Sequence, residues 1–205
     1  MSRPTRSDTA ICGIDEVGRG PLAGPVVAAA VVLSDAVGHD HLRDSKALSA
    51  VARDRIYRQL RASGSAIALG WVWPREIDRL NIHHATLEAM HRAFTQLVTA
   101  FPGATEGIVV RVDGKFCPPI TAPCSAIVGG DRSEPAIMAA SVVAKVLRDR
   151  WMTNYHRGDP RYNFAQHKGY PTPAHQEAIA RYGPDRIHRR SFRGVLAEGV
   201  DRDRP

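Results

Sequence analysis

The chain has 205 residues, of which 43% are hydrophobic and 24% charged, a composition typical of one compact globular domain. Its net charge of +7 suggests a polyanionic partner. Cys12, Cys117 and Cys124 form no C-x-x-C pair, which argues against a disulfide framework and a zinc site. Residues 1–8 lack the apolar core of a signal peptide, and the longest apolar run, 25–33, is too short to cross a bilayer. We therefore expect a cytoplasmic protein without membrane contact.

The first part of the chain predicts strands separated by a glycine-rich connection. Residues 10–14 and 26–33 are apolar and predict two buried strands. Residues 18–25 contain three glycines and two prolines, which exclude regular structure between the strands. The helical spacing and many arginines of residues 47–62 predict a surface helix. Residues 65–72 predict a third strand.

The middle of the chain predicts helices around two further strands. Residues 74–80 predict a short helix with proline in its first turn. Residues 84–98 carry apolar side chains at three- and four-residue steps and predict an amphipathic helix. Residues 107–112 and 122–128 predict the fourth and fifth strands. The helix predicted over 133–151 is apolar on most sides, so we expect it to be largely buried.

The last part of the chain, from residue 154, is rich in arginine, histidine, glycine and proline, with one predicted helix over 173–181. We expect its arginines to be solvated or to make weak phosphate contacts: Arg181, Arg186, Arg189, Arg190 and Arg193. No internal repeat is present. The order of predicted elements indicates an α/β fold, a mixed sheet covered by helices.

Four acids lie at or just beyond predicted strand ends: Asp15, Glu16, Asp113 and Asp131. Strand ends and the loops after them form the usual rim of an active site. Hard cations such as Mg²⁺ and Mn²⁺ prefer oxygen ligands, and two such ions about 3.5–4 Å apart can promote phosphodiester hydrolysis. A single aspartate after a strand is more often a turn former or a helix cap, so this simpler interpretation stays open for each acid.

The glycine-rich connection has two further interpretations. Gly18-x-Gly20-x-x-Ala23 after a strand matches the loose dinucleotide-binding fingerprint. Two acids precede it and would repel a pyrophosphate, and Pro21 lacks a backbone donor. We favour a loop whose backbone around Arg19 approaches a sugar hydroxyl and a phosphate. A tight strand connection without a ligand is the remaining alternative.

Several blocks of this sequence are similar to one known family. Residues 13–28, GIDEVGRGPLAGPVVA, closely resemble the opening signature of bacterial ribonuclease HII, a type 2 ribonuclease H. Shorter blocks follow in the same order: Asp44-Ser45-Lys46, Val112-Asp113-Gly114, Gly130-Asp131 followed by residues 139–145, and residues 167–172 with His175. The resemblance extends from residue 13 to about residue 175.

The resemblance implies the ribonuclease H fold, a mixed five-stranded sheet flanked by helices, with a small helical C-terminal portion. We expect one catalytic domain over 1–205, with its core at about 10–150 and a substrate-contacting portion at about 151–205. The implied activity is metal-dependent hydrolysis of the RNA strand of RNA–DNA hybrids, with cleavage 5′ to single ribonucleotides in duplex DNA. Such cleavage leaves 3′-hydroxyl and 5′-phosphate ends and serves ribonucleotide removal in DNA replication and repair.

The resemblance also implies the catalytic and metal-binding residues. Asp15, Glu16, Asp113 and Asp131 correspond to the family's four-acid site, which holds Mn²⁺ or Mg²⁺, with two ions during catalysis. The 2′-hydroxyl is the group that distinguishes RNA from DNA at a given position.

Substrate contacts are implied for two separate parts of the chain. Gly18, Arg19 and Gly20 correspond to the motif that senses the 2′-hydroxyl, and Tyr170 to the tyrosine that stacks on the following sugar. A ring on that sugar leaves no room for a second 2′-hydroxyl, which favours single ribonucleotides.

Further polar residues are candidates for substrate binding. Lys46 could touch the nucleic-acid backbone or simply begin a helix. Ser141, Lys145, Arg148 and Asp149 share one stripe of the apolar helix. That stripe either faces the site, with Lys145 near a phosphate, or is the solvent face of the helix.

Other ring-bearing residues are expected to have structural roles. His167 and His175 could assist proton transfer, but most such histidines are structural or solvated. Trp71 and Trp73 alternate on one face of a strand, and we expect both in the core.

The expected partner is an RNA–DNA hybrid or duplex DNA containing ribonucleotides. Ribonuclease HIII usually carries an extra N-terminal domain, for which there is no room before Asp15. Residues 199–205 lack an aromatic sliding-clamp motif, so a clamp interaction is unsupported, and we expect a monomer. Two alternatives stay open: a non-catalytic nucleic-acid-binding module on the same fold, and a nucleotide-binding oxidoreductase.

Overall fold

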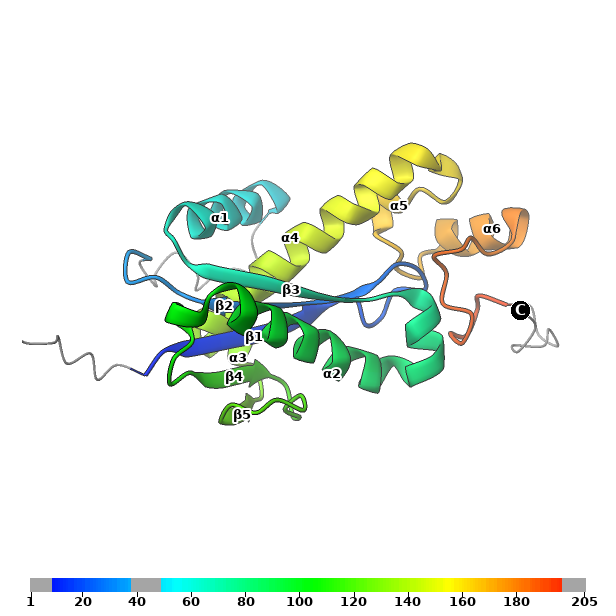
Figure 1. Cartoon of the computed structure of the whole chain (residues 1–205). Coiled ribbons are helices and arrows are strands. Elements are labelled where there is room, and N and C mark those ends of the chain that lie inside the picture. Colours follow the sequence, from blue (N-terminus) through cyan, green and yellow to red (C-terminus); the bar gives the residue numbers. More distant parts are fainter. Residues whose placement is uncertain (1–8, 38–48, 197–205) are drawn as a thin grey trace, which may run out of the picture.

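The computed structural model describes residues 9–37 and 49–196, which form one sheet flanked by helices (Figure 1). The strands are β1 (Ile11–Val17), β2 (Val26–Val32), β3 (Ala66–Val72), β4 (Val109–Asp113) and β5 (Cys124–Ile127). Their order across the sheet is β3-β2-β1-β4-β5. β1 pairs antiparallel with β2 and parallel with β4, so the mixed five-stranded sheet that the resemblance implied is confirmed.

The five predicted helices correspond to four helices of the described structure, which also contains two short helices that were not predicted. The helices are α1 (Ala50–Ala62), α2 (Pro74–Ala100), α3 (Gly130–Ser133), α4 (Pro135–Gly158), α5 (Phe164–His167) and α6 (Pro173–Tyr182), with short 3₁₀ helices η2 (Pro102–Ala104) and η3 (Pro160–Tyr162). The two helices predicted over 74–80 and 84–98 form one element, which is kinked where Asn81 has a φ of 63°. α4 extends seven residues beyond the predicted end at residue 151.

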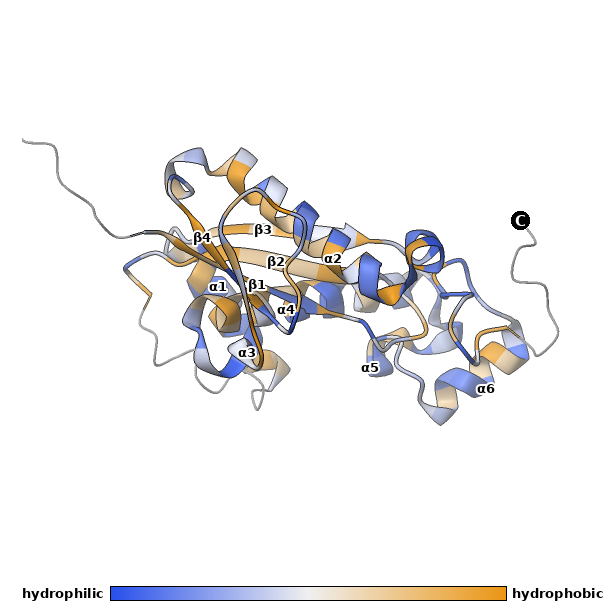
Figure 2. Ribbon diagram, turned by 90° about the horizontal axis from the view of Figure 1, so that it is seen from below, coloured by the Kyte–Doolittle hydropathy of each residue, from blue (hydrophilic) through white to orange (hydrophobic). Residues whose placement is uncertain are grey.

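Both faces of the sheet are covered. α2 packs on one face, and α4 with α1 packs on the other (Figure 1). In β2, Ala28 and Ala30 face the α2 side, whereas Ala29 and Val31 face the α4 side. Because both sides of the strand are buried, it is an unbroken apolar run rather than an alternating one, and Figure 2 shows the central strands as mostly hydrophobic.

α4 crosses β1 at very short range. A Cβ atom on Gly13 would lie 2.0 Å from the carbonyl carbon of Ala136, so no larger residue fits there. This close crossing brings the first half of α4 directly over β1. It therefore fixes the distance between the acids of β1 and the polar side chains of α4.

The C-terminal portion has its own small core, which packs on the loop between β1 and β2. Leu22 and Ala23 of that loop join a buried cluster with Met152, Phe164 and Ile179. Ala23 also forms an antiparallel bridge with His188. Residues far apart in the sequence are thus joined beside the end of β1.

Two tryptophans contradict the expectation that they lie in the core. Trp73 is 40% exposed and Trp71 only half-buried. β3 is an edge strand and Trp73 lies just beyond its end, so no neighbouring strand covers them. Their rings stack at 5.8 Å between centroids, and Trp73 also packs on Trp151 at 5.2 Å.

Among the described helices, none is long and apolar enough to cross a membrane.

Candidate active site

Two of the predicted acids are brought together by strand register. Ile14 of β1 pairs with Val112 of the parallel strand β4. Asp15 and Asp113 follow these residues at the same level and therefore point to the same face of the sheet. That face is the one covered by α4, and Asp15 is only 5% exposed there.

The other two acids approach from different directions. Asp131 lies in α3, between β5 and α4, and its backbone N–H donates to Asp113 Oδ1 at 3.3 Å. Glu16 follows Asp15 within β1, which runs to Val17 rather than ending at residue 14 as predicted. All four acids line one cavity of about 290 Å³, so the structure places the predicted set together.

Burial and mutual repulsion act on these carboxyls. Burial raises the pKa of Asp15 to about 8, the carboxylates of Glu16 and Asp113 add to the shift, and a hydrogen bond with Ser141 opposes it. Burial also raises the pKa of Glu16, although the Arg19 guanidinium 3.3 Å from its Oε1 acts in the opposite direction. Without a further positive charge, the cavity therefore disfavours the ionised forms of Asp15 and Glu16.

The donor set of this cavity fits a hard divalent cation. Its acids offer only oxygen ligands, and Glu16 Oε2 is buried with no hydrogen-bond partner in the described protein. Within residues 9–37 and 49–196, no three His, Cys, Asp or Glu side chains are already arranged as a metal site. Carboxylates without an ion between them repel one another, so closer approach of the four acids requires a cation.

The polar stripe of α4 faces inward. Ser141 and Lys145 line the cavity of the four acids, and Arg148 is fully buried. The alternative of a solvent face is therefore wrong for these three residues. Lys145 Nζ lies 3.0 Å from Asp149, which holds the ammonium group at the edge of the cavity.

Arg53 of α1 lines the same cavity, although sequence reasoning did not single it out. The helix carries several arginines, and only the packing of α1 against α4 distinguishes the one that reaches the acids. Lys46, the predicted phosphate-contacting residue before this helix, lies outside the described residues.

The glycine-rich connection joins two antiparallel strands, and no helix follows it directly. The dinucleotide interpretation requires a strand, a loop and then a helix N-terminus, so that alternative is wrong. Gly18 has a φ of +95°, and a Cβ atom there would lie 2.3 Å from Arg148 Nε. The loop thus requires glycine both for its backbone conformation and for the arginine beneath it.

Two buried arginines donate hydrogen bonds to the backbone carbonyls of this connection. Arg148 donates to the carbonyls of Pro25, Ala23 and Lys168. Arg189, which was expected on the solvated surface, is instead 0% exposed and donates to carbonyls of the connection. The arginine-rich composition of the tail gives no signal that separates Arg189 from its exposed neighbours.

Tyr170 lies beside the predicted 2′-hydroxyl motif. A Cβ atom on Gly20 would lie 3.7 Å from Cε1 of the Tyr170 ring, which is 40% exposed. Leu22 N–H donates to the Gly169 carbonyl at 2.8 Å and ties the two segments together. Segments about 150 residues apart in the sequence thus present one continuous surface.

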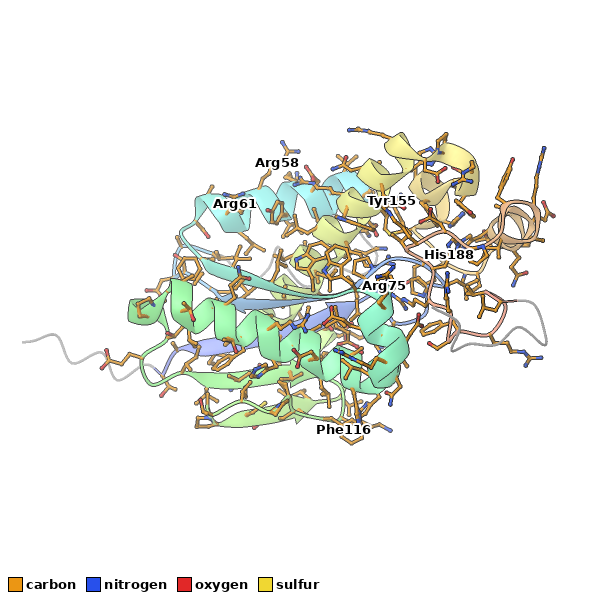
Figure 3. All side chains as sticks on the ribbon, turned by 45° about the vertical axis from the view of Figure 1, so that its right-hand side comes forward. Arg58, Arg61, Arg75, Phe116, Tyr155 and His188 are labelled. Atoms are coloured by element: carbon orange, nitrogen blue, oxygen red, sulfur yellow. The ribbon has the colours of Figure 1, made fainter. Side chains whose placement is uncertain are left out.

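His167 and His175 are buried in the C-terminal portion, where their rings stack on each other and that of His175 also packs on His188. Figure 3 shows His188 in this portion, beside α5 and α6. Burial lowers the pKa of His175 to about 4 and also lowers the pKa of His167. Both rings hydrogen-bond backbone carbonyls, of Tyr162 and Tyr170, so their contacts are structural.

The family model for ribonuclease HII matches residues 12–195 of the chain. Ribonuclease HII of Azoarcus sp. (strain BH72) is 50% identical over 182 residues, which cover 89% of this chain and 86% of that protein. The chain belongs to the ribonuclease HII family. Its predicted identity as an endoribonuclease of the ribonuclease H type, acting on nucleic acid, is thereby confirmed.

Solved structures agree with the fold of this ribonuclease HII family member. Ribonuclease H2 from Pyrococcus horikoshii OT3 has a TM-score of 0.69 and 25% identity, covering 91% of this chain and 95% of that one. Bst-RNase HIII in complex with Mn²⁺ has a TM-score of 0.74 at 19% identity, covering 91% and 68%. Dependence on a divalent metal ion is typical of the family.

Proposed function

We propose that Asp15, Glu16, Asp113 and Asp131 hold Mn²⁺ or Mg²⁺, with two ions during catalysis. The substrate is the RNA strand of an RNA–DNA hybrid or a single ribonucleotide in duplex DNA. One observation carries this proposal: four acids from β1, β4 and α3 line one cavity of about 290 Å³. The raised pKa of Asp15 and the unpartnered oxygen of Glu16 support a missing positive charge among them.

The reaction is hydrolysis of the phosphodiester bond 5′ to the ribonucleotide. The oxygen of a water molecule bonds to phosphorus, and the bond from phosphorus to the 3′ oxygen of the preceding nucleotide breaks. The products carry a 3′-hydroxyl and a 5′-phosphate. Bound divalent ions supply activation of the water and stabilisation of the leaving oxygen.

The residues of the chain bind and orient the substrate around this reaction. Lys145 and Arg53 bring positive charge to the cavity of the acids, where each would attract a phosphate oxygen. Ser141 hydrogen-bonds Asp15 and holds its carboxyl in place. The closeness of α4 to β1 makes this arrangement rigid, since Gly13 leaves no space between them.

Ribonucleotide selection is assigned to the loop around Arg19 and to the ring of Tyr170. Gly18, Arg19 and Gly20 present backbone close to the cavity, where it can read a 2′-hydroxyl. The Tyr170 ring beside Gly20 would stack on the next sugar and exclude a second 2′-hydroxyl. This arrangement favours single ribonucleotides over long hybrids.

The proposal also covers the domain organisation, location and oligomeric state of the protein. The C-terminal portion, about 151–205, contacts substrate through Tyr170, and residues 1–205 act as one catalytic domain. The net charge of +7 supports binding of a polyanion. We place the protein in the cytoplasm as a monomer, with a sliding-clamp interaction unsupported by its sequence.

The experiment that tests this proposal is cleavage of a labelled DNA duplex containing one ribonucleotide, with Mn²⁺, Mg²⁺ or EDTA. We expect metal-dependent cleavage 5′ to the ribonucleotide by the wild-type protein and at least a hundredfold loss in Asp113→Asn, since a metal ligand is removed. Asp159→Asn is the matched control, because Asp159 pairs with Arg161 in η3 and does not line the cavity.

Binding without cleavage under every metal would instead support a non-catalytic nucleic-acid-binding module. Equal activity of Asp113→Asn and wild type would show that the four acids are not the metal site. Equal loss in Asp113→Asn and Asp159→Asn would show a general effect of removing an aspartate.

A further inference from the structure

Arg189 binds the backbone carbonyls of the loop that follows β1. Its Nη2 donates to the Gly18 carbonyl at 2.5 Å and to the Gly24 carbonyl at 2.8 Å. Its Nη1 donates to the Arg19 carbonyl at 3.0 Å, and its Nε to the Gly24 carbonyl at 3.0 Å. One side chain from the C-terminal portion therefore fixes the direction of three peptide groups in the loop.

The charge of Arg189 is solvated mainly by backbone carbonyls, and the nearby Asp78 carboxylate also favours it. The Arg189 side chain is fully buried, and no acid in the described part of the chain forms an ion pair with it. Burial lowers the pKa of the guanidinium to about 9, and the neighbouring charge of Arg148 adds to the shift. Because burying a charge is costly, the carbonyls that solvate it are strongly held in place.

The direction of these carbonyls determines where the loop's N–H groups point. In a trans peptide, the C=O and the N–H lie on opposite sides of the bond. The carbonyls of Gly18 and Arg19 point at Arg189, so the N–H groups of Arg19 and Gly20 point away from it. Within the described residues, neither N–H has an intramolecular acceptor. Gly20 also lies against the exposed ring of Tyr170, on the substrate side.

We propose that Arg189 is a positioning residue for ribonucleotide discrimination. It orients the N–H groups of Arg19 and Gly20 as donors for the 2′ oxygen of a ribose, and it does not touch the substrate itself. The inference rests on the proposed function of the loop and names the residue on which that function depends. A lysine at this position keeps the charge but cannot bind three carbonyls in a planar fork.

Asp78 hydrogen-bonds the backbone that follows Arg189, so its replacement is a second way to disturb the position of Arg189. Its carboxylate accepts hydrogen bonds from the N–H groups of Arg190 and Ser191 at 3.0 and 2.9 Å, and from Ser191 Oγ at 2.6 Å. Asp78 lies on α2 at the protein surface rather than in the buried cluster. Its replacement loosens Arg189 without creating a cavity in the core.

The test measures binding of two duplexes that differ by one 2′-hydroxyl, one with a single ribonucleotide and one entirely DNA. The proteins are full-length Asp113→Asn, the parent, and the same chain with Arg189→Lys, Asp78→Ala or Arg190→Lys. Arg190→Lys is the matched control, because its side chain is exposed on the same segment. Melting temperature is measured for every protein.

We expect Arg189→Lys to bind the ribonucleotide-containing duplex about tenfold more weakly than the parent, with binding of the all-DNA duplex changed less than twofold. Tenfold is the size of effect of losing one or two well-placed hydrogen bonds. Asp78→Ala should shift the ratio of the two affinities in the same direction by about threefold, and Arg190→Lys should leave it unchanged.

Two results would overturn the inference: an unchanged ratio in Arg189→Lys, or equal weakening of both duplexes, which indicates a general structural role. If Arg189→Lys does not fold, the ratio in Asp78→Ala decides, and no change there overturns the inference. If the parent itself binds both duplexes equally, the proposed function of the loop fails first, and the two failures are therefore distinguishable.

Discussion

The Nε2 atoms of His175 and His188 lie 3.0 Å apart in the buried C-terminal core, so one ring donates a proton and the other accepts it. The N–H of Asp185 donates to His188 Nδ1 at 2.8 Å, which places the His188 proton on Nε2. His175 therefore accepts at Nε2 and donates from Nδ1 to the Tyr170 carbonyl at 2.9 Å. Both rings must be neutral for this chain of hydrogen bonds to exist.

We predict that acid weakens this chain and destabilises the fold. Burial lowers the pKa of His175 and of His188 to about 4, from an ordinary value of 6.5. A lowered pKa means that the unfolded state takes up protons first, so stability is complete above about pH 6.5 and is lost as the pH falls towards 4. The loss between pH 7.5 and pH 5 is roughly 2 kcal/mol for each such histidine.

Melting temperatures at pH 7.5 and pH 5.0 check this prediction, with His188→Gln and His84→Gln compared with wild type. His188→Gln keeps a donor towards His175 but cannot be protonated, so its melting temperature should depend less on pH. His84 is exposed, and His84→Gln should behave as wild type. Because the raised pKa of Asp15 acts in the opposite direction over this range, the test is the difference between variants: equal pH dependence in wild type and His188→Gln would contradict the neutral chain.

We predict that Asp15→Asn stabilises the metal-free protein while abolishing cleavage. Burial is the largest cost of charging Asp15, and the carboxylates of Glu16 and Asp113 add to it. A neutral isostere relieves that cost and should raise the melting temperature in EDTA by about 2–4 °C for each kcal/mol relieved. Thermal melting in EDTA and with Mn²⁺ checks this, since added metal should stabilise wild type more than the variant. A lower melting temperature in EDTA would count against repulsion among the acids.

We predict that Lys145→Gln weakens binding of every duplex and reduces its salt dependence. Lys145 Nζ lies at the edge of the acid cavity, where a phosphate of the substrate would bind. Loss of one phosphate contact should lower the slope of log affinity against log salt by about 1. The control Arg61→Gln removes one exposed charge on α1, outside the cavity (Figure 3). Equal slopes for Lys145→Gln and Arg61→Gln would refute a specific contact.

We predict that Tyr170→Ala loses the preference for single ribonucleotides. Burial of an aromatic ring against the sugar contributes roughly 1.5–3 kcal/mol, so cleavage of the single-ribonucleotide duplex should fall about tenfold or more. Cleavage of a long hybrid should fall less, because removal of the ring makes room for a second 2′-hydroxyl. Tyr182→Ala, which removes another exposed tyrosine, is the control. An equal loss on both substrates would assign Tyr170 to general binding.

Several features show where sequence reasoning failed. Trp71 and Trp73 alternate as core residues do, but their strand lies at the sheet edge, and strand order cannot be read from alternation. Arg189 belongs to an arginine-rich tail, yet its neighbours in space are the carbonyls of Gly18 and Gly24. The kink at Asn81 was predicted only as a gap between two helices.

By itself, the sequence determined the family and the α/β architecture and predicted the four acids as the metal site, because these depend on local patterns and a long specific block around Asp15. The sequence also predicted that Asp113 lies at the end of a strand, and it is the last residue of β4. Only the tertiary structure decided that Asp15 and Asp113 share one face, through the parallel register of β1 and β4. It alone decided that Arg189 donates a hydrogen bond to the Arg19 carbonyl, since 170 residues separate them and only packing brings them into contact.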